Sequence, residues 1–228
     1  MVAVAEACTR GEVAIVLSDV EGAGILLQAE RLGVAHRFIA PGDYRTKLDE
    51  EAERAYISAL REAEVDLVVL AGFMRILKGE FLRAFERRVV NVHPSLLPSF
   101  PGLEAWKQAL DAGVKFTGVT VHYVDQGIDS GPIIAQEPVS VREDDTPESL
   151  YARIQEVERV LYPKAISAVA GRLRVDGMTK KAKKSKKKIA IPRRRWQINP
   201  SERVEESAKR YSRPKAKSQD RQSQDEQE

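Results

Sequence analysis

An asparagine and a histidine stand two residues apart in the segment NVHPSLLP, residues 91–98. Alternate residues of a strand point to the same face, so Asn91 and His93 are expected to emerge together where a strand over residues 89–93 ends. Open α/β sheets bind ligands at this carboxyl end, and Pro94 ends the ladder there. An amide beside an imidazole suits an acyl carbon that becomes tetrahedral: Asn91 can donate to the oxyanion, and protonated His93 to the oxyanion or the leaving nitrogen. The alternative is that both side chains only satisfy buried polar groups.

A carboxylate follows in the turn-rich segment GIDSGP, residues 127–132. If Asp129 lies beside His93, it would favour the imidazolium form of the ring. It could also take the proton that an attacking amine releases, directly or through water. The alternative is an ordinary turn aspartate that binds its own backbone.

Short β-branched apolar runs alternate with helical patterns along the chain, which is typical of an α/β fold. We expect a mostly parallel, twisted sheet with helices on both faces. Strands are expected at residues 13–18, 35–39, 66–71, 89–93 and 117–124, with an antiparallel partner of the last one at 133–139. Helices are expected at residues 22–32, 45–64, 80–85 and 102–112, and from Thr146 as N-cap with Pro147 as the first helical residue.

The composition excludes several classes of protein. The 228 residues are 43% hydrophobic and 31% charged, which is enough apolar material for one sizeable core. The single cysteine, Cys8, cannot form an internal disulfide, and the sequence has no Cys/His cluster at zinc spacing. It also has no apolar run of about 18 residues and no secretory signal pattern. We therefore expect a cytoplasmic protein without a metal and without a membrane span.

The charge is divided unevenly between two segments. Residues 178–228 hold 17 Lys and Arg against 7 Asp and Glu, a net of +10, whereas the whole chain has +3, so the preceding residues carry −7. We expect residues 1–176 to form the globular domain and residues 177–228 a basic, disordered tail. Such a tail could make weak contact with nucleic acid phosphates, or it could be solvated without a partner.

Three segments match, in order and spacing, those of a known family: AGFMRIL (71–77), NVHPSLLPSFPG (91–102) and residues 125–132. They closely resemble the folate-dependent formyltransferases of the phosphoribosylglycinamide formyltransferase (glycinamide ribonucleotide transformylase) family, and the resemblance covers essentially the whole globular body. It implies a seven-stranded, mostly parallel sheet. It also implies transfer of a formyl group from 10-formyltetrahydrofolate to the amine of glycinamide ribonucleotide in purine synthesis, by a monomer or homodimer.

The resemblance also implies roles at matching positions. His93 matches the proton donor, Asn91 the amide that polarises the oxyanion, and Asp129 the carboxylate that favours the charged histidine. The positions that match folate-binding residues are Arg45, Met74, Arg75, Ile76, Leu77, Asn91, Asp125, Gln126, Gly127, Ile128 and Asp129. Those that match residues in contact with the ribonucleotide are Gln155, Glu156, Val157 and Glu158. For Arg45 a surface charge in the first turn of a helix is an alternative, and for Glu158 an exposed helix residue.

The first residues depart from the family pattern. The family opens with a strand and a Gly/Ser/Asn-rich loop, which holds the substrate phosphate at a helix N-terminus. Here residues 2–11 match the helix that should follow, so the first strand and the loop are expected to be missing. Either the true start lies upstream, or the protein is a degenerate formyltransferase scaffold with a nucleic-acid-binding tail. Methionyl-tRNA formyltransferase would need a C-terminal β-barrel, and formyltetrahydrofolate hydrolase an N-terminal regulatory domain; we expect neither.

Overall fold

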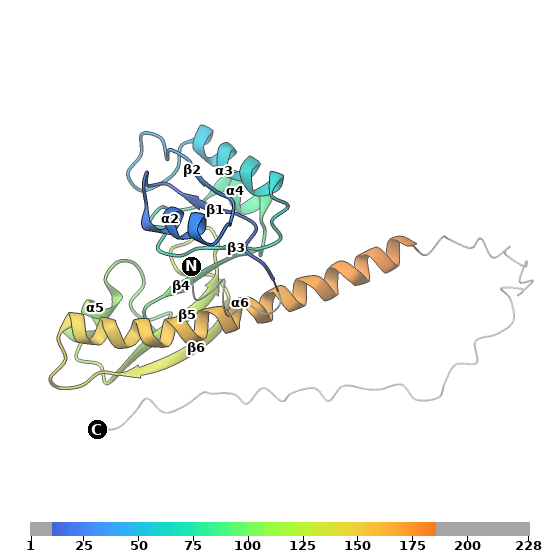
Figure 1. Cartoon of the computed structure of the whole chain (residues 1–228). Coiled ribbons are helices and arrows are strands. Elements are labelled where there is room, and N and C mark those ends of the chain that lie inside the picture. Colours follow the sequence, from blue (N-terminus) through green and yellow to red (C-terminus); the bar gives the residue numbers. More distant parts are fainter. Residues whose placement is uncertain (1–10, 186–228) are drawn as a thin grey trace, which may run out of the picture. The chain divides into compact units, whose positions relative to one another are not determined.

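The computed structural model describes the backbone of residues 11–185 and the side chains of residues 11–173. Its strands are β1 (Val16–Ser18), β2 (His36–Phe38), β3 (Val68–Val69), β4 (Val89–His93), β5 (Phe116–Tyr123) and β6 (Ile133–Ser140). Its helices are α2 (Gly24–Arg31), α3 (Glu50–Glu62), α4 (Gly79–Ala84), α5 (Ala105–Asp111) and α6 (Pro147–Ser185). The expected order of strands and helices is confirmed, and β4 has the expected bounds (Figure 1).

The strands of the described residues form two sheets. β1 and β2 pair in parallel, and β3, β4, β5 and β6 form a second sheet in that order. Within the second sheet β3 and β4 are parallel, whereas β5 is antiparallel to both β4 and β6. The antiparallel partner expected over residues 133–139 is therefore confirmed. The single seven-stranded sheet is not found: the described residues give six strands, and β1 is not hydrogen-bonded to β3.

Helices cover both faces of the larger sheet, as expected. Val89 packs in one apolar cluster with residues of α3 and α4, whereas the next residue, Val90, packs in another cluster with Tyr162 and Ile166 of α6. Neighbouring strand residues point to opposite faces, so β4 is buried on both sides. Figure 1 shows α6 running along β4, β5 and β6.

A helix was expected from residue 45, but α3 begins only at Glu50. The helix prediction for residues 45–49 is therefore wrong. Asp49 is the N-cap, and its carboxylate accepts a hydrogen bond from the Ala52 amide at 2.7 Å. Before it, Lys47 forms a parallel bridge with Ile76, which holds this segment extended. The apolar spacing of the helix continues backwards into this segment, so the spacing alone could not show that the helix starts at the Asp49 cap.

α6 begins as expected, because the amide of Ser149 donates to the hydroxyl of Thr146 at 3.2 Å. The helix continues through the domain boundary expected at 176/177 and runs to Ser185. The predictions for the basic tail beyond residue 185, and those for residues 1–10, lie outside the described residues. Of the helices described, α6 included, none combines the length and the apolar character that crossing a membrane requires.

Candidate active site

The candidate site is built on the paired strands β4 and β5. In this ladder Asn91 stands opposite His122, and His93 stands opposite Thr120. His93 is only 4% exposed and His122 only 2%. The amide nitrogen Nδ2 of Asn91 lies 3.4 Å from Nε2 of His122. The strand pairing therefore places the predicted amide and imidazole on one face of the sheet, with a second imidazole beside them.

Asp129 reaches this cluster from the loop between β5 and β6. One carboxylate oxygen, Oδ2, lies 3.3 Å from Nδ1 of His93, and the other, Oδ1, lies 3.7 Å from Nε2 of His122. Oδ2 also accepts a hydrogen bond from the amide of Gly102 at 2.9 Å. Asp129 has a left-handed backbone, with φ of 50°. The carboxylate thus contacts the histidines rather than its own turn.

Both ring nitrogens of His93 face hydrogen-bond acceptors. Nδ1 faces the carboxylate of Asp129, and Nε2 lies 2.8 Å from the carbonyl oxygen of Phe100. A carbonyl oxygen and an ionised carboxylate can only accept, so this pair of partners suits a ring that carries protons on both nitrogens. The geometry fits a proton donor held between two acceptors.

The ring of His122, in contrast, favours the neutral form. Its Nδ1 lies 2.9 Å from the carbonyl oxygen of Tyr123, and burial lowers the pKa of its ring. A neutral ring that donates from Nδ1 accepts at Nε2, where Asn91 stands. His122 therefore orients the Asn91 amide and leaves its second N–H for another acceptor. The sequence alone does not place His122 in the site, because its position opposite Asn91 depends on the register of β5 on β4.

A buried network fixes the loop that follows His93. The hydroxyl of Thr120 donates to the carbonyl of Ser95 at 2.7 Å and accepts from the amide of Leu97 at 3.0 Å. The Gln136 amide on β6 donates to Thr120 Oγ1 and to the Leu97 carbonyl, both at 2.9 Å. Strands β5 and β6 thereby hold the backbone that leads from His93 to Phe100.

Two of the segments expected to bind folate, the one around Arg45 and residues 74–77, lie side by side. Arg75 forms an ion pair with Asp19 at 2.6 Å and donates to the carbonyl of Tyr44. The amide of Ile76 donates to the carbonyl of Thr46 at 2.8 Å, so the exposed Arg45 lies between two residues that are tied to residues 75–76. Arg75 thus ties Asp19, the residue after β1, to the segment before α3.

The other expected folate positions differ in exposure. Met74 is 74% exposed and Ile128 62%, whereas Leu77 is buried in the core with α3 and α4. Asp125 accepts hydrogen bonds from the amide of Gly127 and the hydroxyl of Ser130, so it shapes the loop that carries Asp129. Gln126 and Gly127 are exposed on this loop.

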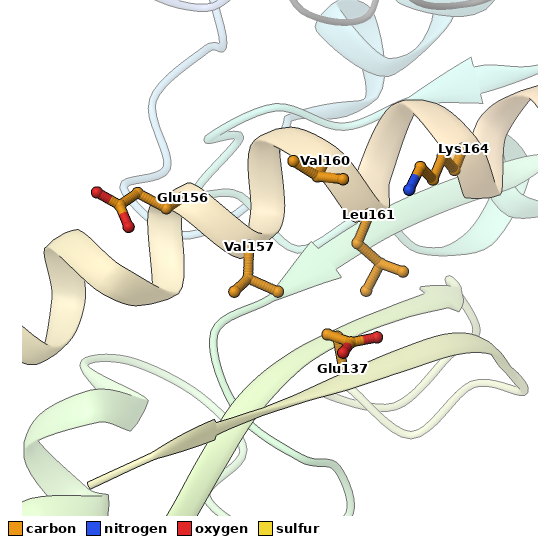
Figure 2. A pocket seen from close by; sticks show the side chains of 6 residues that line it. All are labelled: Glu137, Glu156, Val157, Val160, Leu161 and Lys164. Carbon is orange, nitrogen blue, oxygen red and sulfur yellow. The ribbon is translucent and has the colours of Figure 1, made fainter. Parts of the chain in front are cut away.

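The four expected ribonucleotide positions divide between two sides of α6. Glu156 and Val157 line a hollow between α6 and β6, which Figure 2 shows from close by. Glu158 instead lies in the row of α6 that contains the buried Ile154 and Tyr162, and burial raises the pKa of its carboxyl group. Gln155 is partly buried. In residues 11–173, no three His, Cys, Asp or Glu side chains gather in a way that could hold a metal ion.

A model of the formyl transferase family matches residues 2–166. The chain belongs to the formyl transferase family. The resemblance drawn from the three sequence segments is thereby confirmed, and it extends over the body that carries the Asn91, His93, His122 and Asp129 cluster.

Relatives within the family make the similarity more specific. The phosphoribosylglycinamide formyltransferase of Bacillus subtilis is 42% identical over 158 residues, which are 69% of this chain and 80% of that protein. The trifunctional purine biosynthetic protein adenosine-3 of Gallus gallus is 45% identical over 161 residues, which are 70% of this chain and 16% of that much longer protein. Among solved structures, glycinamide ribonucleotide transformylase 1 from Symbiobacterium toebii is 45% identical with a TM-score of 0.69, covering 74% of this chain and 81% of its own.

Proposed function

We propose that the protein transfers the formyl group of 10-formyltetrahydrofolate to the primary amine of glycinamide ribonucleotide, as a step of purine synthesis. The observation that carries this proposal is the contact of Asp129 with both His93 and His122, beside Asn91, in a chain of this family. The proposed compartment is the cytoplasm, in agreement with a single cysteine in the sequence.

The folate co-substrate would supply an acyl carbon bonded to a nitrogen that can leave. As the substrate amine bonds to this carbon, the carbonyl oxygen gains negative charge, and the second N–H of Asn91 is available to stabilise it. His93 would give its Nε2 proton to the departing nitrogen, while Asp129 stabilises the charged ring and takes up the proton that the amine loses, directly or through water. Atoms and charge then balance without a covalent enzyme intermediate.

The reaction requires the proton on Nε2 of His93, but this nitrogen is hydrogen-bonded to the carbonyl oxygen of Phe100. Substrate binding would therefore have to replace this hydrogen bond. Phe100 and Glu104 both have left-handed backbones, with φ of 56° and 53°. A segment with two such residues stores backbone strain that a rearrangement could release. We infer that residues 100–104 move when the site is filled.

For the folate we propose the surface formed by Arg45, Met74, Arg75, Ile76 and Leu77, together with the loop Asp125, Gln126, Gly127, Ile128 and Asp129. Two facts support it. The contacts of Arg75 and Ile76 bring the first segments together. The exposed Met74 and Ile128 offer apolar surface for a flat ring.

For the ribonucleotide we propose Glu158, with Gln155 beside it on α6. The carboxyl group of Glu158 lies in a core-facing row of α6, and burial raises its pKa. Its ionised form therefore destabilises the fold, and a contact with the substrate would explain why the residue is there. Glu158→Gln is expected to raise the KM for glycinamide ribonucleotide about tenfold or more. The same change should raise the melting temperature at pH 7, because ionisation of this buried group disfavours the folded state above pH ~4.3. Steady-state kinetics and thermal unfolding measure the two effects.

Glu156→Gln is the comparison, because Glu156 lies on the other side of the same helix and is exposed. A larger rise in KM for Glu156→Gln than for Glu158→Gln would place the contact on the side of the hollow instead. Equal KM values for both variants and the wild type would contradict a ribonucleotide contact by either residue.

The activity itself is tested by incubating the purified protein with both substrates. Mass spectrometry of the ribonucleotide detects the added formyl group, and a reaction without ribonucleotide detects hydrolysis. We expect formylated ribonucleotide and little free formate. Formate release that does not depend on the ribonucleotide, or no turnover of either substrate, would overturn the proposal.

A further inference from the structure

One hydroxyl group on the inward side of α6 bonds to two separate segments of backbone. The hydroxyl of Tyr162 lies 2.6 Å from the carbonyl oxygen of Leu70 and 3.1 Å from that of Val90, and it donates its proton between them. The side chain is only 4% exposed. Burial first, and the charge of Glu158 second, raise the pKa of this hydroxyl well above its usual value, so it stays protonated and acts as a donor.

The two carbonyl groups stand directly before two parts of the proposed site. Leu70 follows the last residue of β3 and precedes residues 71–77, which carry the first proposed folate positions. Val90 precedes Asn91 on β4, and its carbonyl also accepts a hydrogen bond from the amide of Leu70 at 2.9 Å. The hydroxyl of Tyr162 therefore ties α6 to the backbone from which both the folate segment and the Asn91 amide extend.

The proposed ribonucleotide contact lies on the same row of the helix. Glu158 precedes Tyr162 by four residues, so the two are neighbours on one face of α6, about 6 Å apart along the axis. The helix holds Glu158 at a fixed distance from Tyr162, and Tyr162 is bonded to the strand ends. The position of Glu158 relative to Asn91 is therefore set through this one hydroxyl.

We propose that Tyr162 is a positioning residue for formyl transfer: its hydroxyl holds the helix that binds the ribonucleotide in place against the strand ends that hold the formyl donor and Asn91. This inference rests on the proposed function. The reacting amine and formyl carbon must meet at about 3 to 3.5 Å, and a displacement of about 1 Å can lower the rate about 100-fold. Because the two substrates bind to different elements, their mutual distance depends on how those elements are tied together. The hydroxyl is buried and bonded to backbone, so it acts through these elements and not on the reacting atoms.

The first test is the steady-state kinetics of Tyr162→Phe, which loses the hydroxyl and keeps the ring. It should fold, because the Val90 carbonyl keeps its bond from the Leu70 amide. We expect kcat to fall about tenfold or more, with the KM of each substrate within about twofold of the wild type. Tyr56→Phe is the matched control, because the Tyr56 hydroxyl is also buried but has no hydrogen-bond partner in residues 11–173. It should keep the wild-type kcat. Thermal unfolding of both variants sets an assay temperature at which each is folded.

The second test combines Tyr162→Phe with Glu158→Gln. If Tyr162 acts through the ribonucleotide contact on α6, its loss should lower kcat/KM by about threefold or less once that contact is weakened. A residue that only stabilises the fold would give the same kinetic effect in both backgrounds. Equal losses in the two backgrounds, a wild-type kcat for Tyr162→Phe, or an equal loss for Tyr56→Phe would overturn this inference alone. A wild type that formylates no ribonucleotide would instead overturn the proposed function, and this inference with it.

Discussion

His122 joins the two residues that the sequence placed on one strand to the carboxylate that it placed on a loop. Its Nε2 lies 3.4 Å from the Asn91 amide and 3.7 Å from Asp129. The residue types and spacing were enough to single out Asn91, His93 and Asp129. They could not single out His122 in the same way, because a histidine on an alternating strand is more often a structural residue than a catalyst. Only the antiparallel register of β5 on β4 brings it to the cluster.

The lowered pKa of His122 predicts a pH dependence of stability. Between this lowered pKa and the unfolded value near 6.5, the unfolded chain binds a proton at this residue and the folded chain does not. The free energy of unfolding should therefore fall as the pH drops below about 6.5. His122→Gln should remove this part of the slope in urea unfolding measured at several pH values. His36→Gln, on the exposed strand β2, should keep it; a wild-type slope in His122→Gln would contradict the prediction.

Two threonines on β5 give a matched pair for the network behind His93. Thr120→Val removes the hydroxyl that bonds the backbone of Ser95 and Leu97, so it should lower the free energy of unfolding by about 2 to 4 kcal/mol. The hydroxyl of Thr117 is buried and has no hydrogen-bond partner in residues 11–173, so Thr117→Val should change stability by less than about 0.5 kcal/mol. Denaturant titration measures both. Similar losses for the two variants would contradict the assigned network.

Whole strands and helices were more predictable than their ends. β4 was predicted with its bounds because its apolar run stops at Pro94, a residue that must end the ladder. Residues 45–49 were wrongly assigned to a helix, since their apolar spacing continues that of α3 and only the cap at Asp49 separates them. The strand expected over residues 66–71 is hydrogen-bonded in a ladder only at Val68–Val69. The apolar pattern of a sequence shows which residues face the core, but not how many backbone groups form hydrogen bonds with a neighbouring strand.

The hairpin of β5 and β6 positions Asp129, and a substitution at Gly131 tests this role of the hairpin. A Cβ atom at Gly131 would lie 1.8 Å from the backbone oxygen of Tyr123, so Gly131→Ala must displace the loop. Because Asp129 is two residues away, we expect kcat to fall by roughly ten- to a hundredfold. Gly24→Ala is the control: nothing lies within 4 Å of its added Cβ, and an alanine in α2 should be neutral or slightly stabilising. A normal kcat for Gly131→Ala would mean that the loop need not hold this position.

At the scale of the whole molecule, the long helix α6 has one side packed on the sheet and one side exposed. The inward face of α6 packs on β4 and β5 through Tyr162 and Ile166, and the Tyr162 hydroxyl donates to the backbone of β4 and of Leu70. On its outward side Val160 is exposed. The alternation of strands and helices was enough to predict the class of fold and the two covered faces. The division into two sheets was not predictable, because Ile15 and Leu17, next to and within β1, share an apolar cluster with Val68 of β3 without pairing.

The central claim is that Asp129 makes His93 a proton donor for formyl transfer, and the turnover number of Asp129→Asn tests it most directly. Asparagine keeps the size of the side chain and can still meet the Gly102 amide, but it removes the negative charge beside Nδ1 of His93. We predict that kcat for formylation of glycinamide ribonucleotide falls about 100-fold or more, with little change in either KM. An Asp129→Asn protein with the kcat of the wild type would contradict the claim.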